Sequence, residues 1–230
     1  MFGDSYSTPD VYVTPADSFW GLTAARASIP AITNCSSKGN SLDSVSHMLI
    51  SIQNEIDWTN DLIFVGIPPL ERITVVGDDQ QKICQLDTAN WTKEWIDNTI
   101  LSGTTTLQNY GEDRVMVLHS NRSWTETQAL QKIFLLTAWL DSKQANYLIL
   151  NLSKSFDPTD WLPSNEFLLP YIKNHSRCIL FTDTYQSINI DINQPVDYNK
   201  YGWNGHHSSA GNLRFFEKSL WPKLKECNLC

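Results

Sequence analysis

A serine and a histidine near opposite ends of the chain are the residues best suited to covalent chemistry. Ser5 closes the tripeptide Gly3-Asp4-Ser5, and His207 ends the polar run Asn204-Gly205-His206-His207. A serine hydroxyl becomes a nucleophile when an imidazole accepts its proton, and the same imidazole can return that proton to a leaving group. The pair therefore predicts acyl transfer through Ser5, with His207 as the base, if the fold brings the two together.

A second polar run supplies candidates for stabilising the negative charge that develops during acyl transfer. Gly39 and Asn40 lie between a short apolar run and a predicted helix. Glycine has no Cβ, so its backbone N–H can approach a substrate oxygen closely. Arg72 follows the run Pro68-Pro69-Leu70-Glu71, and its guanidinium suits an oxyanion or an anionic substrate. A surface arginine paired with Glu71 is the alternative interpretation.

The order and spacing of these blocks resemble the SGNH (GDSL) hydrolase family over nearly the whole chain. The motifs that carry the resemblance are Gly3-Asp4-Ser5, the block ending at Gly39, the block opening at Gly66, and His207-Ser208-Ser209-Ala210-Gly211-Asn212. The resemblance implies a three-layer α/β/α sandwich with a mainly parallel, flavodoxin-like sheet. It also implies Ser5 as nucleophile, Ser5 and Gly39 as oxyanion N–H donors, His207 as base, and no metal or organic cofactor.

Two positions depart from the family pattern. The third block reads Gly66-Ile67-Pro68-Pro69 where the family has an asparagine that donates to the oxyanion, and proline has no donor. Losing one such donor typically costs about 10²–10³ in rate, unless Asn40 or Arg72 replaces it. Asn204 stands where the family has the acid of the triad; it can orient His207 but cannot stabilise an imidazolium by charge. Asp183 is the nearest alternative acid.

The elements that must position these residues alternate along the chain. Apolar runs predict strands at 29–34, 61–66, 147–150 and 178–181. Helical spacing predicts helices at 42–56 capped by Ser41 or Asp43, at 125–140 capped by Thr125, and at 210–224, where Pro222 kinks or ends the helix. This alternation predicts an α/β fold with a mainly parallel sheet covered on both faces. Reactive groups in such sheets collect where the strands end.

Length and composition set limits on the protein's class. The 230 residues, with 41% hydrophobic and 18% charged residues, predict one domain over 1–230, with an insertion at about 73–121 that includes a helix at 91–100. The net charge of -8 argues against nucleic acid as a partner. No run approaches the roughly 20 apolar residues of a membrane span. The start of the chain lacks signal-peptide features, which favours a cytoplasmic or virion-associated location over classical secretion.

Metal chemistry is not expected from this sequence. The five histidines show no spacing typical of metal ligands, and Cys227 and Cys230 lack a second pair that would complete a zinc site. We therefore expect free thiols at the chain end and no metal.

The sequence predicts a serine esterase. It indicates the type of reaction more directly than the class of substrate. The acidic, tryptophan-rich chain favours a small or glycan ester, in particular a carbohydrate O-acetyl ester, over a lipid surface. Trp203 could line a sugar or acyl pocket, and Asp4 lies beside the nucleophile. The main alternative is a catalytically weak or inactive module of this fold that binds glycan or forms part of a surface or virion assembly. A third is an unrelated α/β protein with a coincidental Gly-Asp-Ser.

Overall fold

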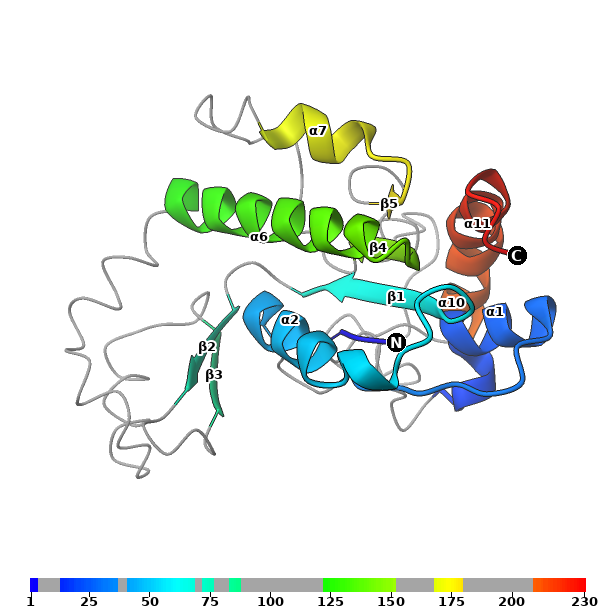
Figure 1. The fold of residues 1–230 in the computed structure, drawn as a ribbon. Helices are drawn as coiled ribbons and strands as arrows, with labels where there is room; N and C mark the ends of the chain where they lie inside the picture. The colour runs from blue at the N-terminus through cyan, green and yellow to red at the C-terminus, as the bar shows by residue number, and fades with distance from the viewer. Residues whose placement is uncertain are drawn as a thin grey trace, which may run out of the picture.

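The protein is a mixed α/β structure in which helices and strands alternate. The structure, a computed structural model, describes residues 1–3, 13–36, 41–68, 72–76, 83–87, 122–151, 168–179 and 209–230. The helices are α1 (Phe19–Ala27), α2 (Leu42–Ser51), α6 (Arg122–Ser142), α7 (Leu168–Asn174), α10 (Ser209–Phe215) and α11 (Trp221–Glu226) (Figure 1). The strands are β1 (Leu62–Ile67), β2 (Arg72–Val76), β3 (Ile83–Asp87), β4 (Asn146–Asn151) and β5 (Cys178–Ile179).

The main sheet is parallel. Its strands β1, β4 and β5 pair in that order, each parallel to its neighbour. The first residues of the chain extend the sheet beyond β1, because the N–H of Phe2 donates to the Phe64 carbonyl at 2.9 Å and the N–H of Gly66 donates to the Phe2 carbonyl at 2.8 Å. These two bonds form a parallel bridge between Phe2 and Val65. The strands predicted at 61–66, at 147–150 and at the start of 178–181 are confirmed.

A fifth segment pairs with the chain start from its other side. The Met1 amine donates to the Thr33 carbonyl at 2.7 Å, and the N–H of Cys35 donates to the Met1 carbonyl at 2.8 Å. Bonds from one residue to positions two apart on its neighbour are the pattern of a parallel pair. Across the sheet the order is therefore 33–35, 1–3, β1, β4 and β5.

The segment at 29–34 differs from its prediction as a buried strand. Its side chains from Pro30 to Thr33 are exposed, and Ile32 is 44% exposed. The segment pairs with residue 1 through the backbone of Thr33 and Cys35, and the Cys35 side chain packs against the cluster that contains Phe2 and Val65. Ile29 and Ile32 belong to an apolar run, which is why a buried strand was predicted. Such a run does not show whether the strand has neighbours on both sides or lies at the edge of the sheet.

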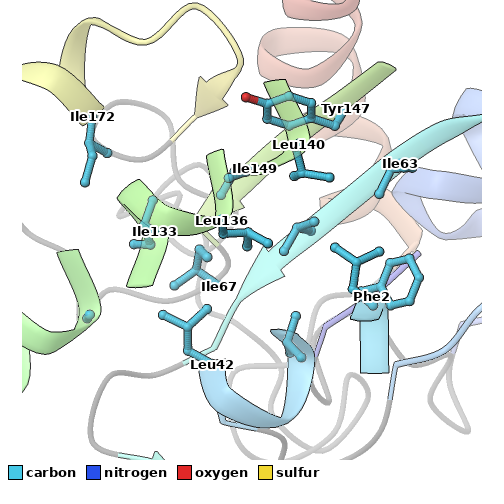
Figure 2. Packing of buried hydrophobic residues seen from close by; sticks show 14 of the residues in the cluster. Phe2, Leu42, Ile63, Ile67, Ile133, Leu136, Leu140, Tyr147, Ile149 and Ile172 are labelled. Carbon is cyan, nitrogen blue, oxygen red and sulfur yellow. The ribbon is translucent and has the colours of Figure 1, made fainter. Parts of the chain in front are cut away.

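Side chains of β1 and β4 alternate between two separate hydrophobic clusters. Ile63, Val65 and Ile67 contribute to a cluster with α2, α6 and α7, part of which is drawn in Figure 2. Phe64 contributes to a second cluster with α1, α10 and α11, together with Leu148 and Leu150 of β4. Successive residues of a strand point to opposite faces, so helices pack on both faces of this sheet. Burial on both faces explains why these strands read as continuous apolar runs.

Helix α6 is longer than its sequence prediction. It begins at Arg122 instead of after Thr125, so Thr125 lies within the helix and does not cap it. No glycine or proline lies between residues 122 and 125 to stop a helix from extending upstream. The predicted inward face is correct at Leu130, Ile133, Thr137 and Leu140, which are all 0% exposed.

Helix α2 begins as predicted. The Ser41 side chain accepts a hydrogen bond from the N–H of Ser44 at 3.3 Å and is the N-cap. Asp43, the other candidate cap, instead forms an ion pair with Lys132 of α6 at 2.7 Å. The α-helix ends at Ser51, and the stretch that continues to Ile56 contains a short 3-10 helix, Gln53–Glu55, in place of a further α-helical turn.

The last helical segment is interrupted by a wider turn. A π-helical stretch, Phe216–Leu220 (η7), separates α10 from α11, and Pro222 lies in the first turn of α11. Pro222 cannot donate to a carbonyl one turn earlier, and the π turn lies directly before it, so the α-helical pattern is interrupted near the predicted place although the segment continues to Glu226. Leu213, predicted to face inward, is 42% exposed, while Asn212 and Phe215 of α10 are buried. The prediction was wrong at Leu213 because the π turn breaks the 3.6-residue spacing.

Strands β2 and β3 form a separate two-stranded antiparallel sheet. They lie in or beside the predicted insertion at 73–121. The helix predicted at 91–100 lies outside the described residues.

Candidate active site

The residues predicted for the active site fall almost entirely outside the described part of the chain. Those outside it are Asp4, Ser5, Gly39, Asn40, Asp183, Trp203, Asn204 and His207. Arg72 is described as the first residue of β2, in its backbone only. What the structure describes is the chain immediately before or after each of these residues.

The chain approaches Ser5 from the middle of the main sheet. Met1, Phe2 and Gly3 are buried, and Phe2 pairs with Val65 in the parallel direction. The segment therefore points the same way as β1 and leaves the sheet at the edge where β1 ends. We call this edge, at which the parallel strands finish, the carboxyl edge. Ser5 is the second residue after Gly3.

The chain approaches Gly39 from the neighbouring segment at the same edge. The Asn34 side chain accepts a hydrogen bond from the N–H of Ser36 at 3.0 Å, an Asx turn that redirects the backbone as the segment ends. The Ser36 hydroxyl is buried and has no hydrogen-bond partner among the described residues. The described chain resumes at the cap Ser41, so Gly39 and Asn40 directly precede the start of α2.

The end of β1 supplies no side-chain donor. Its last residue, Ile67, is 0% exposed, and Pro68 after it is buried. Neither residue has a side-chain hydrogen-bonding group. An asparagine in this block would lie beside the end of the segment that leads to Ser5, and this chain has none there.

The segment after His207 starts against α1. The N–H of Phe19, the first residue of α1, donates to the Asn212 side chain of α10 at 3.0 Å. The rings of Phe19 and Phe215 lie edge to face with centroids 5.5 Å apart. His207 is two residues before Ser209, where α10 begins.

The far end of the same helical segment fixes its direction. After α11, the Cys227 thiol donates to the carbonyl of Ser176, which shortly precedes β5 and so lies at the opposite edge of the sheet. Residues 209–226 span about 27 Å at a helical rise of about 1.5 Å per residue. The far end of the segment therefore lies near the edge where the strands begin, and the start of α10 lies against α1, whose Phe19 contacts the middle of β1.

The buried chain start has an unusual electrostatic environment. Burial lowers the pKa of the Met1 amine to about 6, and the nearby Cys35 thiol opposes that shift. The amine lies between the two neighbouring segments of the sheet, where its charged form loses hydration. A protonated amine is therefore disfavoured there at neutral pH.

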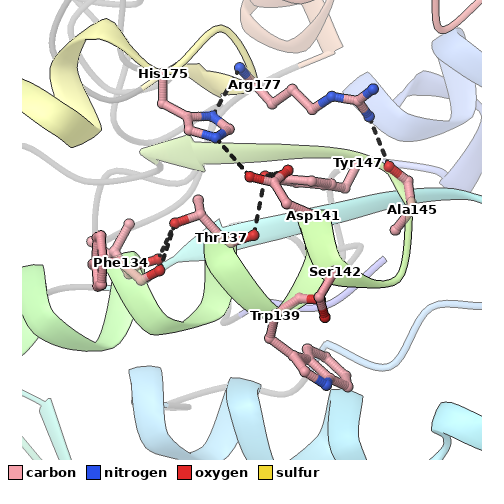
Figure 3. A network of polar contacts seen from close by, with 10 residues as sticks. Phe134, Thr137, Trp139, Asp141, Ser142, Ala145, Tyr147, His175 and Arg177 are labelled. Carbon is pink, nitrogen blue, oxygen red and sulfur yellow. Dashed lines mark hydrogen bonds and ion pairs between the residues drawn. The ribbon is translucent and has the colours of Figure 1, made fainter.

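A polar cluster at the opposite edge was not anticipated from the sequence. Asp141, at the end of α6, accepts a hydrogen bond from Tyr147 at 2.7 Å and lies 3.2 Å from Nε2 of His175 (Figure 3). Nδ1 of His175 accepts from the N–H of Arg177 at 3.3 Å, so the ring proton is on Nε2 and is donated to Asp141. Arg177 in turn donates to the carbonyl of Ala145 at 2.8 Å.

This cluster has a structural role, because its hydrogen bonds connect several elements of the fold. Burial, and then the hydrogen bond to Asp141, raises the pKa of Tyr147, which keeps its hydroxyl neutral as a donor. The hydrogen bonds join α6, β4 and the turn between α7 and β5 at the edge where the strands begin. His175 and its partner Asp141 lie 34 residues apart in the sequence. No local pattern signals the pair.

Metal ligation and thiol chemistry find no support in the described residues. No group of three or more His, Cys, Asp or Glu side chains could hold a metal ion there. The cysteines that are described, Cys35, Cys178, Cys227 and Cys230, are free thiols. Burial raises the pKa of Cys178 to about 12, so its reactive thiolate form is scarce.

Two further searches gave negative results. Of the helices in the described ranges, none combines the length and the apolar character that crossing a membrane requires. Comparison of the chain with protein-family models, with curated proteins and with solved structures found no match.

Proposed function

We propose that the chain is a serine ester hydrolase of the SGNH type, which forms an acyl-enzyme on Ser5. The observation that carries the proposal is the placement of three chain segments. Those that lead to Ser5 and to Gly39 run toward the carboxyl edge of one parallel sheet, and the start of α10, which follows His207, is held against the same sheet through Phe19. Their order along the chain is that of the family's blocks.

The strand order supports a three-layer, flavodoxin-like fold. Numbered along the chain, the segments lie in the order 2-1-3-4-5 across the sheet, with helices packed on both faces. In doubly wound sheets of this order, ligands bind at the carboxyl ends of strands 1 and 3, where the winding reverses. Gly3 ends the first of these strands and Ile67 ends the third, so Ser5 follows directly from the expected binding position.

The length of chain available limits how far Ser5 and His207 can lie from this edge. Two residues of fully extended chain span at most about 7 Å. Ser5 is two residues from Gly3, and His207 is two residues from Ser209. The buried Ser36 hydroxyl, which has no partner among the described residues, lies on the segment that leads to Gly39, and a catalytic role is one of the explanations for an unsatisfied buried polar group.

The proposed reaction uses groups of this chain alone. Ser5 Oγ attacks the ester carbonyl carbon while His207 accepts the hydroxyl proton, and the N–H groups of Ser5 and Gly39 stabilise the oxyanion. Collapse of the intermediate breaks the ester bond, and His207 protonates the departing alcohol. Water, deprotonated by His207, then attacks the acyl-enzyme and releases the acid. Asn40 or Arg72 would replace the missing asparagine donor, and Asn204 would orient His207 without contributing charge.

The substrate we favour is a carbohydrate O-acetyl ester. Acetyl is the smallest common acyl group, and Trp203, adjoining the histidine block, offers a ring face on which a sugar can stack. Asp4, next to the nucleophile, could accept a hydrogen bond from a sugar hydroxyl. A short-chain aryl ester is a practical substitute for testing the chemistry.

A second function has two departures from the family pattern in its favour. The chain lacks a donor at the end of β1, and Asn204 lacks the charge of the triad acid. Both departures lower the expected rate, so a glycan-binding or structural module with this fold and little catalysis is the competing proposal. Covalent chemistry at Ser5 distinguishes the two.

The deciding experiment is labelling with a fluorophosphonate probe. Mass mapping of the parent should locate the adduct on the peptide that contains Ser5. Ser5→Ala and His207→Ala should lose the adduct, whereas Ser142→Ala, which removes an exposed hydroxyl of α6, should keep it. A parent chain that is folded, unlabelled and inactive toward aryl esters would contradict the hydrolase and favour the binding module.

A further inference from the structure

A buried side chain of α10 satisfies a backbone group of α1. Asn212 is 3% exposed, and its Oδ1 accepts the hydrogen bond from the N–H of Phe19 at 3.0 Å, across 193 residues of chain. The first N–H groups of a helix have no partner within the helix. Because the backbone N–H can only donate, the amide oxygen of Asn212 must face it. The start of α1 is thus capped by Asn212 as well as by the local cap Ser18, which accepts from Gly21.

Phe19 links this contact to the sheet. Its ring is 0% exposed and packs edge to face on Phe215, one turn along α10 from Asn212, and on Phe64 of β1 at a centroid distance of 6.5 Å. One residue of α1 therefore contacts both the start of α10 and the middle of the sheet. The start of α10 cannot move relative to β1 without breaking these contacts.

The same helix holds the chain that arrives from Ser5. α1 packs against the turn Pro15–Asp17, and a Cβ at Gly21 would lie 2.0 Å from the carbonyl oxygen of Pro15. Only a residue without a Cβ allows this approach. The α1 helix thus contacts two segments at once: the one that follows Ser5 and the one that follows His207.

We infer that Asn212 is a positioning residue for His207, holding the start of α10 at the distance from Ser5 that the reaction requires. The inference rests on the proposed function. His207 is five residues before Asn212 on the same segment. Without the side-chain oxygen, the buried N–H of Phe19 loses its acceptor, and the start of α10 shifts or admits water. A misplacement of about 1 Å in a catalytic group can cost about 10²-fold in rate.

The test compares three variants by kcat, KM and thermal unfolding on a short-chain aryl ester. Asn212→Ala should lower kcat about 10- to 100-fold with KM within about twofold, since substrate binding does not use this contact. Asn212→Asp keeps an acceptor for the Phe19 N–H and should recover most of the loss. Thr137→Val, the matched control, removes a buried hydroxyl of α6 on the other face of the sheet and should lower stability but leave kcat unchanged.

Two results would overturn the inference. One is a folded Asn212→Ala with the parent's kcat, and the other is a Thr137→Val that loses kcat as strongly as Asn212→Ala does. If Asn212→Ala does not fold, Asn212→Ser serves instead, because its shorter side chain reaches the N–H only through water. Asn212→Ser should then have a lower kcat than Asn212→Asp. Equal kcat values for these two variants would also overturn the inference.

A cross-linking measurement, which does not depend on catalysis, tests this inference separately from the proposed function. In the variant Ser5→Cys/His207→Cys, a short thiol cross-linker such as dibromobimane should join the two positions, as identified by mass mapping. Adding Asn212→Ala should slow that cross-link about tenfold, and adding Thr137→Val should not. If the fluorophosphonate does not label the parent but the cross-linking rate still depends on Asn212, the hydrolase proposal fails and the positioning role of Asn212 stands. Equal rates in all backgrounds remove the positioning role, whatever the parent hydrolyses.

Discussion

At the scale of single residues, the proposed site differs from the family pattern at two places. If the proposal holds, Asn204 takes the place of an acid, and Ile67 and Pro68 follow one another where a donor would be expected. The neighbouring backbone is nevertheless that of a well-packed sheet, with Ile67 fully buried. The substitutions therefore change the chemistry available at the carboxyl edge without loosening the strand that leads to it.

Restoring the triad acid should raise activity. In Asn204→Asp, a carboxylate would stabilise the imidazolium that forms on His207 during attack, so kcat/KM should increase. The reverse exchange in serine proteases costs about 10⁴, which is the upper limit for the gain. The measurement is kcat/KM of the variant and the parent on one ester from about pH 6 to 9. A gain below about tenfold would point to an existing acid such as Asp183, and a folded but slower variant would show that Asn204 has another role.

Ser5 and His207 should act as one unit. Ser5→Ala and His207→Ala should each abolish aryl-ester hydrolysis while the thermal unfolding temperature stays near that of the parent. The double variant should be no slower than either single variant, because removing one member already removes the pair's contribution. Additive losses would mean that the two residues contribute by separate routes, and residual hydrolysis in Ser5→Ala would place the nucleophile elsewhere.

At the scale of elements, the helices and strands that were predicted correctly are those with a clear residue pattern within the element itself. β1 and β4 are short apolar runs, and α2 has helical spacing with Ser41 as its cap. α1 was missed because five of its nine residues are buried, including Gly21, so it has no polar face along its length. α7 was missed because it is short and has Pro170 in its first turn. Strand and helix positions near the site were thus largely predictable.

The contacts that hold the candidate site together were not predictable in this way. Asn212 was part of a recognised motif, but its bond to Phe19 joins residues 193 apart in sequence. The burial of Asn212 in place of Leu213 follows from the π turn, which no spacing in the sequence indicates. Whether Ser5 and His207 meet stays a prediction.

The packing of α1 predicts that a glycine-to-alanine substitution will destabilise the protein, which is the opposite of its usual effect within a helix. Gly→Ala within a helix normally stabilises it by about 1 kcal/mol. In Gly21→Ala the new methyl group would overlap the Pro15 carbonyl, so the free energy of unfolding should instead fall by about 1–3 kcal/mol. Urea unfolding measures the change, and the exposed Ala25→Gly, expected to lose about 0.5–1 kcal/mol through helix propensity alone, is the control. A more stable Gly21→Ala would contradict the close approach of α1 to Pro15–Asp17.

At the scale of the whole molecule, the chain start is among the most enclosed parts of the sheet. Phe2 is 4% exposed, and its neighbours on the two sides come from 33–35 and from β1. The two hydrophobic clusters lie on opposite faces of the strands beside it, and Figure 2 draws part of the one that contains Phe2. A change of charge at Met1 is therefore a change within the sheet and affects the stability of the entire fold.

Stability should rise with pH as the Met1 amine loses its proton. Its pKa is about 6 in the folded chain against an ordinary 8.0, so between these values the unfolded chain binds more protons than the folded one. The free energy of unfolding should therefore increase from pH 6 to pH 8, by at most about 3 kcal/mol from this group. Urea unfolding of the chain with a free amine, compared with the N-acetylated chain, isolates the effect. Equal pH slopes for the two forms would contradict it.

The central position of residues 1–3 also has a consequence for folding. Phe2 pairs with Val65 of β1, about sixty residues along the chain, and α1 is capped by Asn212, which lies 193 residues after Phe19. Folding that relies on such distant partners is slow, and strands without their neighbours are prone to associate with other chains. Until these distant partners have come together the centre of the sheet is exposed, so an unfolded chain of this protein should bind chaperones that recognise extended apolar segments.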